Sequence, residues 1–386
     1  MPRVVLLSDV YYPFTCGVAK VVDILSRELP KYGVRTTLVV PAYTRAAYNI
    51  RIQGTLRVFG IKSVGYVPIY REMKIPEITL SYILMRRLLG VEFGCETVFH
   101  AHSPYVLLSL LRIASKFRGV KTKVVFTYHT IVSEYLKNGV GFFGRLLIGL
   151  DKVVTGSVIN RSSIVITPTY YSMRMLIDHL PKYLRRLSAK MIRIPNPLDR
   201  RDYEQPRRSV TEYYSGVEEY NYALWVGRIS HEKRPTLLMG LFKHLPYKLV
   251  IVGKGPLLHS LKRLAPDNVL FTGYVEEEVL KSLLRYARCF IIANSFDNLP
   301  LAVMEAMAQG VPIISYYLGG HNEYIRHGEN GFKFRDVRDA RKYIVRLFKS
   351  DDLRDEMGEE ARKTALMFHP DRVIPMHISL YRKVLS

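Results

Sequence analysis

The chain has 386 residues, of which 48% are hydrophobic, and a formal net charge of +23. That length exceeds what one hydrophobic core usually organises, so we expect two domains, and the apolar content excludes an extensively disordered protein. Residues 1–200 hold 29 lysines and arginines against 11 acidic residues, whereas residues 201–386 hold 28 against 23. We therefore expect the first half to meet an anionic partner, such as an anionic bilayer, a phosphorylated substrate or nucleic acid.

Cysteine usage and hydropathy narrow the class further. The three cysteines, Cys16, Cys95 and Cys289, lie far apart and form no C-x-x-C pair. They are too few and too dispersed for a disulfide framework or a zinc site, which predicts a reducing cytoplasm. No run of 18 apolar residues and no cleavage pattern of a signal peptide occur, so we expect a protein that does not cross a membrane. Only three glutamines stand beside 27 tyrosines, a composition that favours a heat-loving source.

In the first half, short apolar runs rich in β-branched residues alternate with amphipathic stretches. The runs predict buried parallel strands at residues 3–9, 36–42, 97–102, 123–130, 163–168 and 191–196. The stretches predict helices over Val18–Tyr32, Val106–Phe117 and Tyr171–His179.

The second half repeats this alternation. It predicts strands at residues 222–227, 248–253, 268–273, 289–294 and 311–317, and helices that begin near Pro235, Pro256, Glu276 and Leu299. Such a pattern indicates an α/β protein with two doubly wound domains. A polar stretch at 198–220 marks the join, so we expect domains at 1–200 and 201–365, with a terminal segment at 366–386 that packs back onto the first.

In open α/β sheets, ligands bind beyond the carboxyl ends of the strands, where loops and helix N-termini converge. Arg228 and Lys233 follow the strand at 222–227, in a loop that leads into a predicted helix. Cations in a glycine-led loop against a helix N-terminus form a phosphate-binding arrangement. After the next strand, Gly253 and Gly255 flank a lysine. A single G-x-G is weak evidence, because either glycine can serve only the turn.

The loop after the strand at 289–294 leads into a helix and carries two acids, Asp297 and Glu305. Asn298 can cap that helix, whose first turn holds Pro300, and the helix dipole favours an anion at its entrance. Glu305 lies within an apolar stretch, where an ionised glutamate is almost never buried without a partner. The residues leave open whether that partner is part of the chain or a bound ligand.

Taken in order, these segments resemble the retaining glycosyltransferases of family 4. Members have the GT-B fold, in which two Rossmann-like domains face each other across a cleft. "WVGRISHEKRP" is similar to the family's G-R-x-x-x-x-K segment and "IVGKGP" to its G-x-G-P turn. "VLFTGYV" and "LGGHNEYIRHGENGF" follow the family's order, and the stretch from Asp297 to Glu305 aligns with its E-x7-E motif. The resemblance covers most of residues 220–335.

The resemblance implies roles for the matching residues. Arg228 and Lys233 would hold the diphosphate of a nucleotide-sugar donor and stabilise the leaving group. Glu305 would bind the ribose hydroxyls, so the ligand becomes its partner. Asp297 would contact sugar hydroxyls; the family usually has glutamate there, and the shorter side chain bears on which sugar is preferred. The full implied set comprises His129, Arg228, Lys233 and Asp297 as catalytic residues, and Gly17, Arg228, Lys233, Gly253, Gly255, Asn298, Leu299, Pro300, Leu301 and Glu305 as donor-binding residues.

The first 200 residues resemble the family more loosely. "YYPFTCGVAKVV" is similar to its acceptor-side loop, with Cys16-Gly17 where Gly-Gly is usual, and "RIPNPLD" to the P-N-G-[IV]-D segment before the hinge. "TYHTIVSEYL" resembles members that glycosylate lipids, which would place His129 against the sugar in the cleft. "HAHSP" contributes His102 at a neighbouring strand end. For both histidines, a structural role with one satisfied hydrogen bond is the alternative.

The implied reaction is transfer of a hexose from a UDP- or GDP-sugar, with retention at the anomeric carbon. Preorganised positive charge on the departing diphosphate would do much of the work, without a carboxylate as covalent nucleophile. Cations and a helix dipole can replace a metal, and no D-x-D-like motif occurs. We expect neither a required metal nor a tightly bound cofactor.

The acceptor is indicated less directly. Segments 78–90 and 144–154 have apolar faces rimmed by arginine and lysine, as an interfacial membrane element needs. With the basic first half and the resemblance to diacylglycerol glucosyltransferases and phosphatidylinositol mannosyltransferases, they favour a lipid acceptor and a position on the cytoplasmic face of the cell membrane. An ordinary core-facing helix is the alternative for either segment, and a soluble sugar or sugar phosphate stays open as acceptor.

Other classes of protein fit parts of the pattern. A nucleotide-sugar epimerase or hydrolase of the same fold is the nearest alternative, because a fold does not decide a reaction. A glycoside hydrolase would need paired acids but not Arg228 and Lys233. A nicotinamide-dependent oxidoreductase would carry G-x-G-x-x-G after the first strand, which "DVYYPFTCGVAK" lacks. A nucleic-acid-binding protein would explain the charge but not Glu305. Only turnover separates a sugar-nucleotide binding protein from an enzyme.

Overall fold

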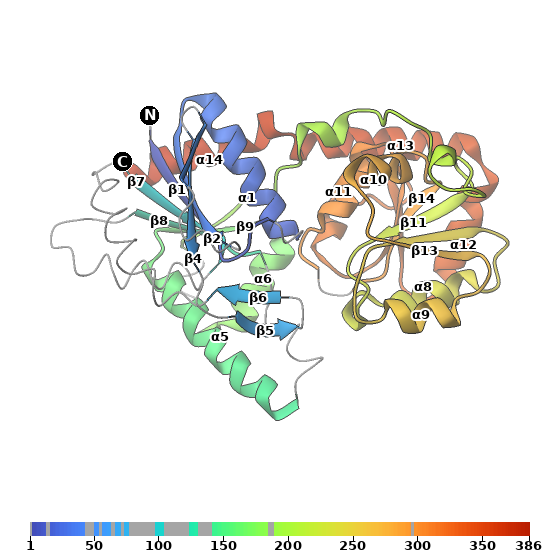
Figure 1. Ribbon diagram of the computed structural model, residues 1–386, viewed down its shortest axis with the longest axis horizontal. Helices are drawn as coiled ribbons and strands as arrows, with labels where there is room; N and C mark the ends of the chain where they lie inside the picture. The colour runs from blue at the N-terminus through green and yellow to red at the C-terminus, as the bar shows by residue number, and fades with distance from the viewer. Residues whose placement is uncertain are drawn as a thin grey trace. The chain divides into compact units, whose positions relative to one another are not determined.

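The structure is a computed structural model (Figure 1). It describes residues 2–12, 16–42, 50–53, 56–62, 66–70, 73–76, 97–103, 123–129, 141–183, 189–294 and 297–386. The chain divides into two compact units, Met1–Pro197 with Pro370–Ser386, and Leu198–His369. The chain therefore builds most of the first unit, then the whole second unit, and returns to the first with its last helix.

An eight-stranded sheet in the order β10-β9-β8-β7-β1-β2-β4-β3 forms the centre of the first unit. Its strands are β1 (Arg3–Leu7), β2 (Arg35–Ala42), β3 (Ile50–Gln53), β4 (Leu56–Lys62), β7 (Thr97–Ala101), β8 (Lys123–Thr127), β9 (Ile164–Thr167) and β10 (Met191–Arg193). Neighbours run parallel, except that β3 is antiparallel to β4. The six predicted strands are confirmed, whereas β3, β4 and a separate antiparallel pair, β5 (Tyr66–Tyr70) and β6 (Met73–Pro76), were not predicted.

The helices of the first unit that the structure describes are α1 (Gly17–Glu28), α5 (Gly141–Arg161), α6 (Tyr170–His179) and α14 (Pro370–Leu385). The predicted helix at 18–32 ends earlier as an α-helix and continues as the 3-10 turn η1 (Leu29–Tyr32). The turn stops at Gly33, whose φ of 76° favours glycine. The predicted helix Val106–Phe117 and the basic segment 78–90 lie outside the described residues.

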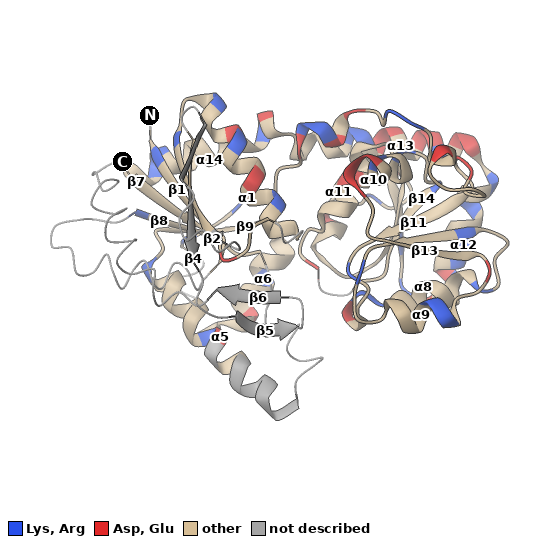
Figure 2. Ribbon diagram, viewed as in Figure 1, with Lys and Arg blue, Asp and Glu red and all other residues tan. Residues whose placement is uncertain are grey.

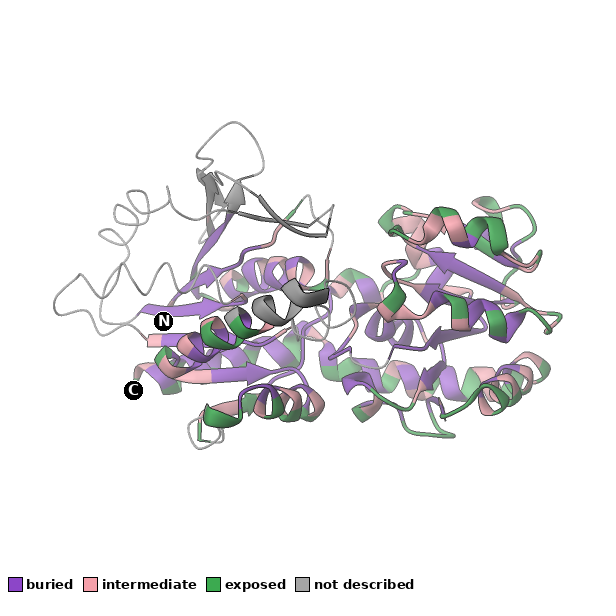
Figure 3. Ribbon diagram, turned by 90° about the horizontal axis from the view of Figure 1, so that it is seen from below, coloured by how far each residue is buried: buried purple, intermediate pink, exposed green. Residues whose placement is uncertain are grey.

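Helix α14 is part of the first unit's interior. It packs against α1 and β7 and buries Val373, Ile374 and Tyr381. Near its start, the hydroxyl of Tyr32 donates to a carboxylate oxygen of Asp371 at 2.8 Å. The central strands of both sheets are almost wholly buried (Figure 3), as parallel sheets require when helices cover both faces.

The second unit is built on six parallel strands in the order β13-β12-β11-β14-β15-β16. They are β11 (Tyr222–Val226), β12 (Lys248–Val252), β13 (Val269–Gly273), β14 (Cys289–Ile292), β15 (Ile313–Tyr316) and β16 (Gly331–Phe334). Its helices are α8 (Pro235–Phe242), α9 (Leu258–Leu264), α10 (Glu277–Arg285), α11 (Leu301–Ala308), α12 (Val337–Lys349) and α13 (Asp351–Ala365). The five predicted strands are confirmed, and each of the four predicted helices is present within two residues of its expected start.

The polar stretch at 198–220 is not a free linker. It forms the short 3-10 turns η3 (Arg200–Tyr203) and η4 (Val210–Glu212) and is bonded to the second unit. The side-chain amide of Gln309 donates to the backbone oxygens of Asp202 and Glu204, at 2.5 and 2.9 Å. Side chains of the unit thus satisfy backbone groups that no helix or sheet satisfies here. A composition without periodicity gives no sign of such bonding.

A close contact between two helices sets the position of α11, which carries Glu305. Helix α13 packs against α11, and a Cβ added at Gly358 would lie 2.3 Å from the carbonyl oxygen of Gly310. Gly310 ends the α11 segment with a φ of 74°, which also favours glycine. Glycine at 358 therefore allows the backbones to approach more closely than alanine would.

Gly358→Ala should lower the free energy of unfolding by about 1–3 kcal/mol, because an extra methyl group in a packed interior forces backbone shifts. Gly240→Ala is the matched control: Gly240 lies in α8 with nothing within 4 Å of an added Cβ. That variant should gain up to about 1 kcal/mol from helix propensity. Urea unfolding of both variants measures the difference, and equal effects would contradict the close contact.

Candidate active site at the strand ends of the second unit

The strand order of the second unit creates a switch point between β11 and β14. From β11 the chain moves outward to β12 and β13, and from β14 it moves outward the other way to β15 and β16. Loops that leave neighbouring strands in opposite directions leave a crevice between them at the carboxyl edge, where open α/β sheets bind ligands. The loop with Arg228 and Lys233 follows β11, and the loop with Asp297 follows β14. The two predicted clusters therefore border the same crevice.

An ion pair joins these two loops. The Nζ of Lys233 lies 2.6 Å from Oδ1 and 2.5 Å from Oδ2 of Asp297. The Lys233 side chain is 16% exposed and that of Asp297 only 9%. The side-chain amide of Asn294 also donates to Asp297 Oδ2. Burial by itself raises the pKa of Asp297, but the charge of Lys233 and the hydrogen bonds from Lys233 and Asn294 outweigh it and lower the pKa.

His321 completes the buried polar group behind this pair. The ring is fully buried, and its Nε2 lies 2.8 Å from the hydroxyl of Ser315 at the end of β15. Burial lowers its pKa to about 4, although Asp297 acts in the opposite direction. His321 is therefore neutral near pH 7, and Lys233 and Asp297 are the charged residues of this group.

Gly253 and Gly255 have a clear local role. A Cβ at Gly253 would lie 1.9 Å from the carbonyl oxygen of Gly227, and one at Gly255 would lie 2.3 Å from that of Ile229. The loops after β11 and β12 are also bonded directly, because the amide of Ile229 donates to the carbonyl oxygen of Lys254 at 2.9 Å. These glycines let the two loops approach closely. They thereby fix the backbone position of Arg228, which lies between Gly227 and Ile229.

The start of α11 differs from the prediction in one respect. The N-cap is Pro300, not Asn298, and no side chain caps the helix. Pro300 has φ −63° and ψ 125°, so the chain is still extended there and the helix begins at Leu301. Asn298 and Leu299 precede it as buried residues, and Glu305, which is 7% exposed, lies one turn inside the helix. The amide of Val303 donates to the carbonyl oxygen of Pro300 at 3.1 Å, and the amides that precede it lie at the positive end of the helix, which favours an anion.

The predicted residues of the first unit also border a switch point. There the chain moves outward from β1 to β2 and from β7 to β8. Gly17 begins α1, the helix that follows β1, while His102 follows β7 and His129 follows β8. His102 Nδ1 and His129 Nε2 are 2.8 Å apart. The structure thus brings together two histidines that sequence reasoning treated separately.

Charge in the second unit is distributed unevenly. Acidic residues gather along α13 (Figure 2), whose first turn lies at the amino edge of the sheet beside Arg288. The loops that follow β11 and β12 at the carboxyl edge carry Arg228, Lys233, Arg234 and Lys254 instead. Among the described loops, these are therefore the ones suited to an anionic ligand.

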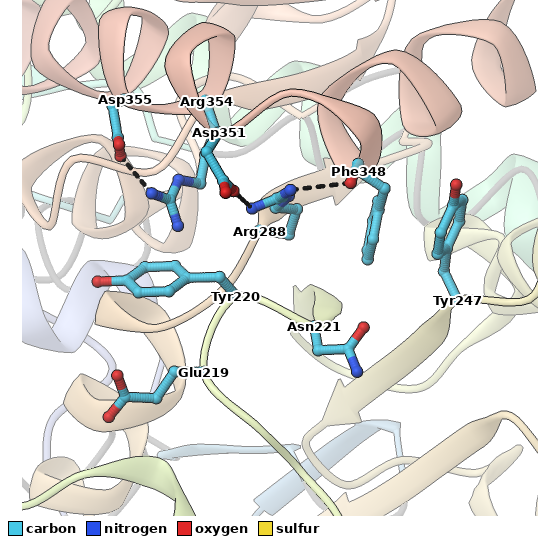
Figure 4. Close-up of a pocket in the computed structure, with 9 residues that line it drawn as sticks. All are labelled: Glu219, Tyr220, Asn221, Tyr247, Arg288, Phe348, Asp351, Arg354 and Asp355. Carbon is cyan, nitrogen blue, oxygen red and sulfur yellow. Dashed lines mark hydrogen bonds and ion pairs between the residues drawn. The ribbon is translucent and has the colours of Figure 1, made fainter.

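A hollow at the amino edge of the same sheet is not part of this site (Figure 4). Its two arginines already have partners. Arg288 pairs with Asp351, and Arg354 donates to Asp355 at 2.6 Å and lies over the ring of Tyr220 at 3.9 Å. These charges are satisfied within the hollow, and it lies at the opposite ends of the strands from Lys233. We assign it a structural role.

In the described part of α5, which overlaps the predicted interfacial segment 144–154, one side of the helix packs on the core. Asp151 is 3% exposed and its carboxylate lies 3.1 Å from Nε2 of His179, so this side of the helix packs on the core. Lys152 and Val153 are exposed on the other side. Among the described residues, no helix could cross a membrane, and no three histidine, cysteine, aspartate or glutamate side chains gather as ligands for one metal ion.

Two family models match the chain in sequence order. The model described as Glycosyltransferase Family 4 matches residues 15–202, and the one described as Glycosyl transferases group 1 matches residues 214–364. The protein is a glycosyltransferase of family 4. As such it transfers a sugar from a nucleotide sugar, and its two α/β units form the GT-B fold.

Individual relatives of this glycosyltransferase differ in what they act on. It is 24% identical over 303 residues to N-acetyl-alpha-D-glucosaminyl L-malate synthase of Bacillus anthracis, with 75% of each chain covered. It is 25% identical over 340 residues to alpha-monoglucosyldiacylglycerol synthase of Streptococcus pneumoniae, covering 81% of this chain and 71% of the relative. The crystal structure of Anabaena HepE in complex with UDP-glucose matches with a TM-score of 0.70 at 15% identity, over 99% of this chain and 100% of that one. At that identity it supports the fold alone.

Sequence reasoning gave the glycosyltransferase no role for His321 or Asn294. A signal for His321 was present in the two glycines before it. Gly319 has a φ of 108°, and a Cβ there would lie 2.5 Å from the ring of His321 and 3.2 Å from the carbonyl oxygen of Asp297. The glycine at 319 is needed because any larger residue would collide with the imidazole of His321 where it packs beside the backbone of Asp297. Asn294 carried no such signal, because a polar residue after a strand is common.

We expect Lys233→Met to lower the free energy of unfolding by about 3–5 kcal/mol, because Asp297 would keep a buried charge without its cation. The double variant Lys233→Met/Asp297→Asn should lose less than the sum of the single variants, with a coupling of about 1 kcal/mol or more. Urea unfolding of the four proteins measures this. Lys243→Met, at an exposed lysine after α8, should stay within about 0.5 kcal/mol of wild type. Additive losses would show that the pair is not coupled.

The glycosyltransferase should lose stability as the pH falls from about 6.5 to about 4. Burial lowers the pKa of His129, His321 and His377 to about 4, whereas an unfolded histidine titrates near 6.5. In that window the unfolded chain binds protons that the folded one does not, so acid favours unfolding. Melting temperatures at intervals from pH 7.5 to 4.5 test this. His377→Phe should flatten the slope, and the exposed His244→Gln should leave it unchanged.

Proposed function

We propose that this glycosyltransferase moves a hexose from a nucleoside diphosphate sugar to a lipid acceptor at a membrane surface, with retention at the anomeric carbon. The donor half of the proposal rests on one observation. Arg228, the Lys233–Asp297 pair and the start of α11 border one crevice at the switch point of the second sheet. Cations, a helix N-terminus and a buried acid at one crevice suit a diphosphate that carries a sugar.

Each part of the donor has a matching group. Arg228 and Lys233 hold the diphosphate, and the backbone N–H groups of Asn298, Leu299 and Leu301 add hydrogen-bond donors at the positive end of α11. Gly253 and Gly255 keep side chains out of the way where the loops meet. Glu305, one turn inside α11, accepts from the ribose hydroxyls. We assign Gly17, at the start of α1, to binding of the sugar.

The ion pair supports this assignment through its charge balance. Before donor binding, the charge of Lys233 is matched by Asp297. When a diphosphate arrives, its oxygens take over part of the Lys233 ammonium, and the Asp297 oxygens are released to accept from sugar hydroxyls. One set of charge-assisted hydrogen bonds replaces another, so neither buried charge is left without a partner. The charges of the site are therefore preorganised for an anionic ligand that carries hydroxyl groups.

The chemical step follows from the same groups. An acceptor hydroxyl oxygen forms a bond to the anomeric carbon as the bond from that carbon to the diphosphate oxygen breaks. The hydroxyl proton passes to the departing diphosphate, and attack on the same face retains the configuration. Negative charge grows on the diphosphate, where Arg228 and Lys233 stabilise it. Asp297 and His129 orient the sugar by hydrogen bonds to its hydroxyls.

Two observations support a lipid acceptor. Residues 1–200 carry 29 basic against 11 acidic residues, which suits an anionic bilayer, and the relative from Streptococcus pneumoniae is named for a glucosyldiacylglycerol product. A soluble acceptor is the second candidate, because the relative from Bacillus anthracis is named for an L-malate product. A cytoplasmic protein bound peripherally to the membrane, from a heat-loving source, would fit the first candidate.

The donor is tested by melting curves with UDP, GDP, ADP, their hexose conjugates and NAD. At a hundred times its dissociation constant the true donor should stabilise by about 2.7 kcal/mol. Glu305→Gln should weaken that donor's binding about tenfold or more by removing a charged acceptor for the ribose hydroxyls. Glu356→Gln, at an exposed glutamate on α13, should bind like wild type. Equal binding by both variants would refute the role of Glu305, and stabilisation by NAD alone would refute the donor class.

The acceptor is tested with the donor so identified, carrying a radiolabelled sugar. Diacylglycerol is supplied in phosphatidylglycerol or phosphatidylcholine vesicles, beside glucose, glucose 6-phosphate and L-malate. We expect label in the lipid fraction, more with the anionic vesicles, and less at 0.5 M salt as screening increases. Label confined to a soluble product would reject the lipid acceptor and leave the transferase activity intact.

A further inference from the structure

We propose that His102 is a positioning residue that fixes the tautomer of His129, so that the neutral His129 carries its proton on Nδ1. Its importance for turnover rests on the proposed function of His129. The assignment of the proton itself rests only on geometry within the first unit.

The two rings are held in contact by adjacent strands. His102 directly follows β7 and His129 lies two residues beyond β8, which pair in parallel. His102 Nδ1 and His129 Nε2 are 2.8 Å apart, which is a hydrogen bond between the two nitrogens. The backbone amide of His102 donates to the carbonyl oxygen of Leu7 at 2.9 Å, so the position of His102 is also tied to β1.

The other nitrogen of His102 decides which way that bond runs. His102 is 3% exposed, and its Nε2 is buried with no hydrogen-bond partner among the described residues. A proton on Nε2 would leave a buried N–H donor unsatisfied, which proteins almost never tolerate, whereas a bare lone pair there costs less. The proton of His102 therefore sits on Nδ1 and is donated to His129 Nε2. Because His129 accepts at Nε2, its own proton must be on Nδ1.

A second layer holds His102 in place. The His100 ring packs on His102 with centroids 4.2 Å apart. His100 is itself fixed at both nitrogens, since Nε2 lies 2.7 Å from the hydroxyl of Thr127 and Nδ1 lies 2.7 Å from that of Tyr381. Tyr381 belongs to α14, so this helix helps to hold His100, and through His100 also His102, in place.

Both histidines of the bonded pair stay neutral near pH 7. Burial lowers the pKa of His129 to about 4 and places that of His102 well below its usual value, to which the neighbouring His100 also contributes. A neutral imidazole with a fixed tautomer presents one N–H donor in one direction. This arrangement suits a hydroxyl of a bound sugar, which can accept from that N–H.

The test compares His102→Leu with His102→Asn. Leucine removes the donor, whereas the asparagine amide can place an N–H near the position of Nδ1. ¹⁵N NMR of histidine-labelled protein, with the His129 signals assigned from His129→Gln, reports which nitrogen is protonated. Wild type and His102→Asn should show His129 protonated at Nδ1, and His102→Leu should show a mixture. With the cognate donor, kcat should fall about tenfold or more in His102→Leu and recover largely in His102→Asn.

The outcomes separate the two claims. Wild-type His129 protonated at Nε2 would overturn the inference, whatever the activity. A mixture in His102→Asn as large as in His102→Leu would also overturn it, because the donated hydrogen bond would not be the cause. If the tautomers behave as expected but kcat is unchanged in His102→Leu, the inference stands and the proposed role of His129 in transfer fails. Melting curves confirm that the variants are folded.

Discussion

The parallel direction of the strands is the constraint on which the site depends. In a parallel sheet every carboxyl end lies at one edge, so loops far apart in sequence leave the sheet side by side. In the second unit this brings the loop after β11 to the loop after β14, 64 residues apart at Lys233 and Asp297. In the first unit it brings His102 to His129, 27 residues apart. Both pairs are consequences of strand order, and neither pair is formed by residues close in sequence.

Burial then decides what those pairs can be. The buried Asp297 can remain charged only because Lys233 supplies an opposing charge and both Lys233 and Asn294 donate hydrogen bonds to it. Both partners come from strand-end loops. In the first unit the same physics acts on histidines, which lose their charge instead of finding a counter-ion. The second unit thus offers permanent charge at its crevice, and the first offers neutral hydrogen-bonding rings. A charged diphosphate needs opposite charge, whereas an uncharged sugar needs neutral hydrogen-bonding groups.

Much of the fold could be predicted from the sequence, because buried parallel strands are apolar runs and helices between them show a 3.6-residue period. β3 and β4 were missed because Arg51, Arg57 and Lys62 interrupt their apolar residues, so neither strand is a continuous apolar run. The motifs indicated candidate residues for the site but not how those residues bond to one another. Pairing of Lys233 with Asp297 and of His102 with His129 depends on which strands are neighbours, which residue order does not state. The capping role expected of Asn298 failed because the chain stays extended through Pro300.

The return of α14 to the first unit has a consequence for how the protein is made. The second unit is continuous, Leu198–His369, and can fold as soon as it leaves the ribosome. Most of the first unit is synthesised earlier. Its histidine cluster nevertheless lacks His377 and Tyr381 until residues 370–386 have been synthesised. The half of the molecule that is synthesised first is therefore the last to be completed. During translation its interior stays incomplete, and the imidazoles that are buried in the finished structure are still exposed to water.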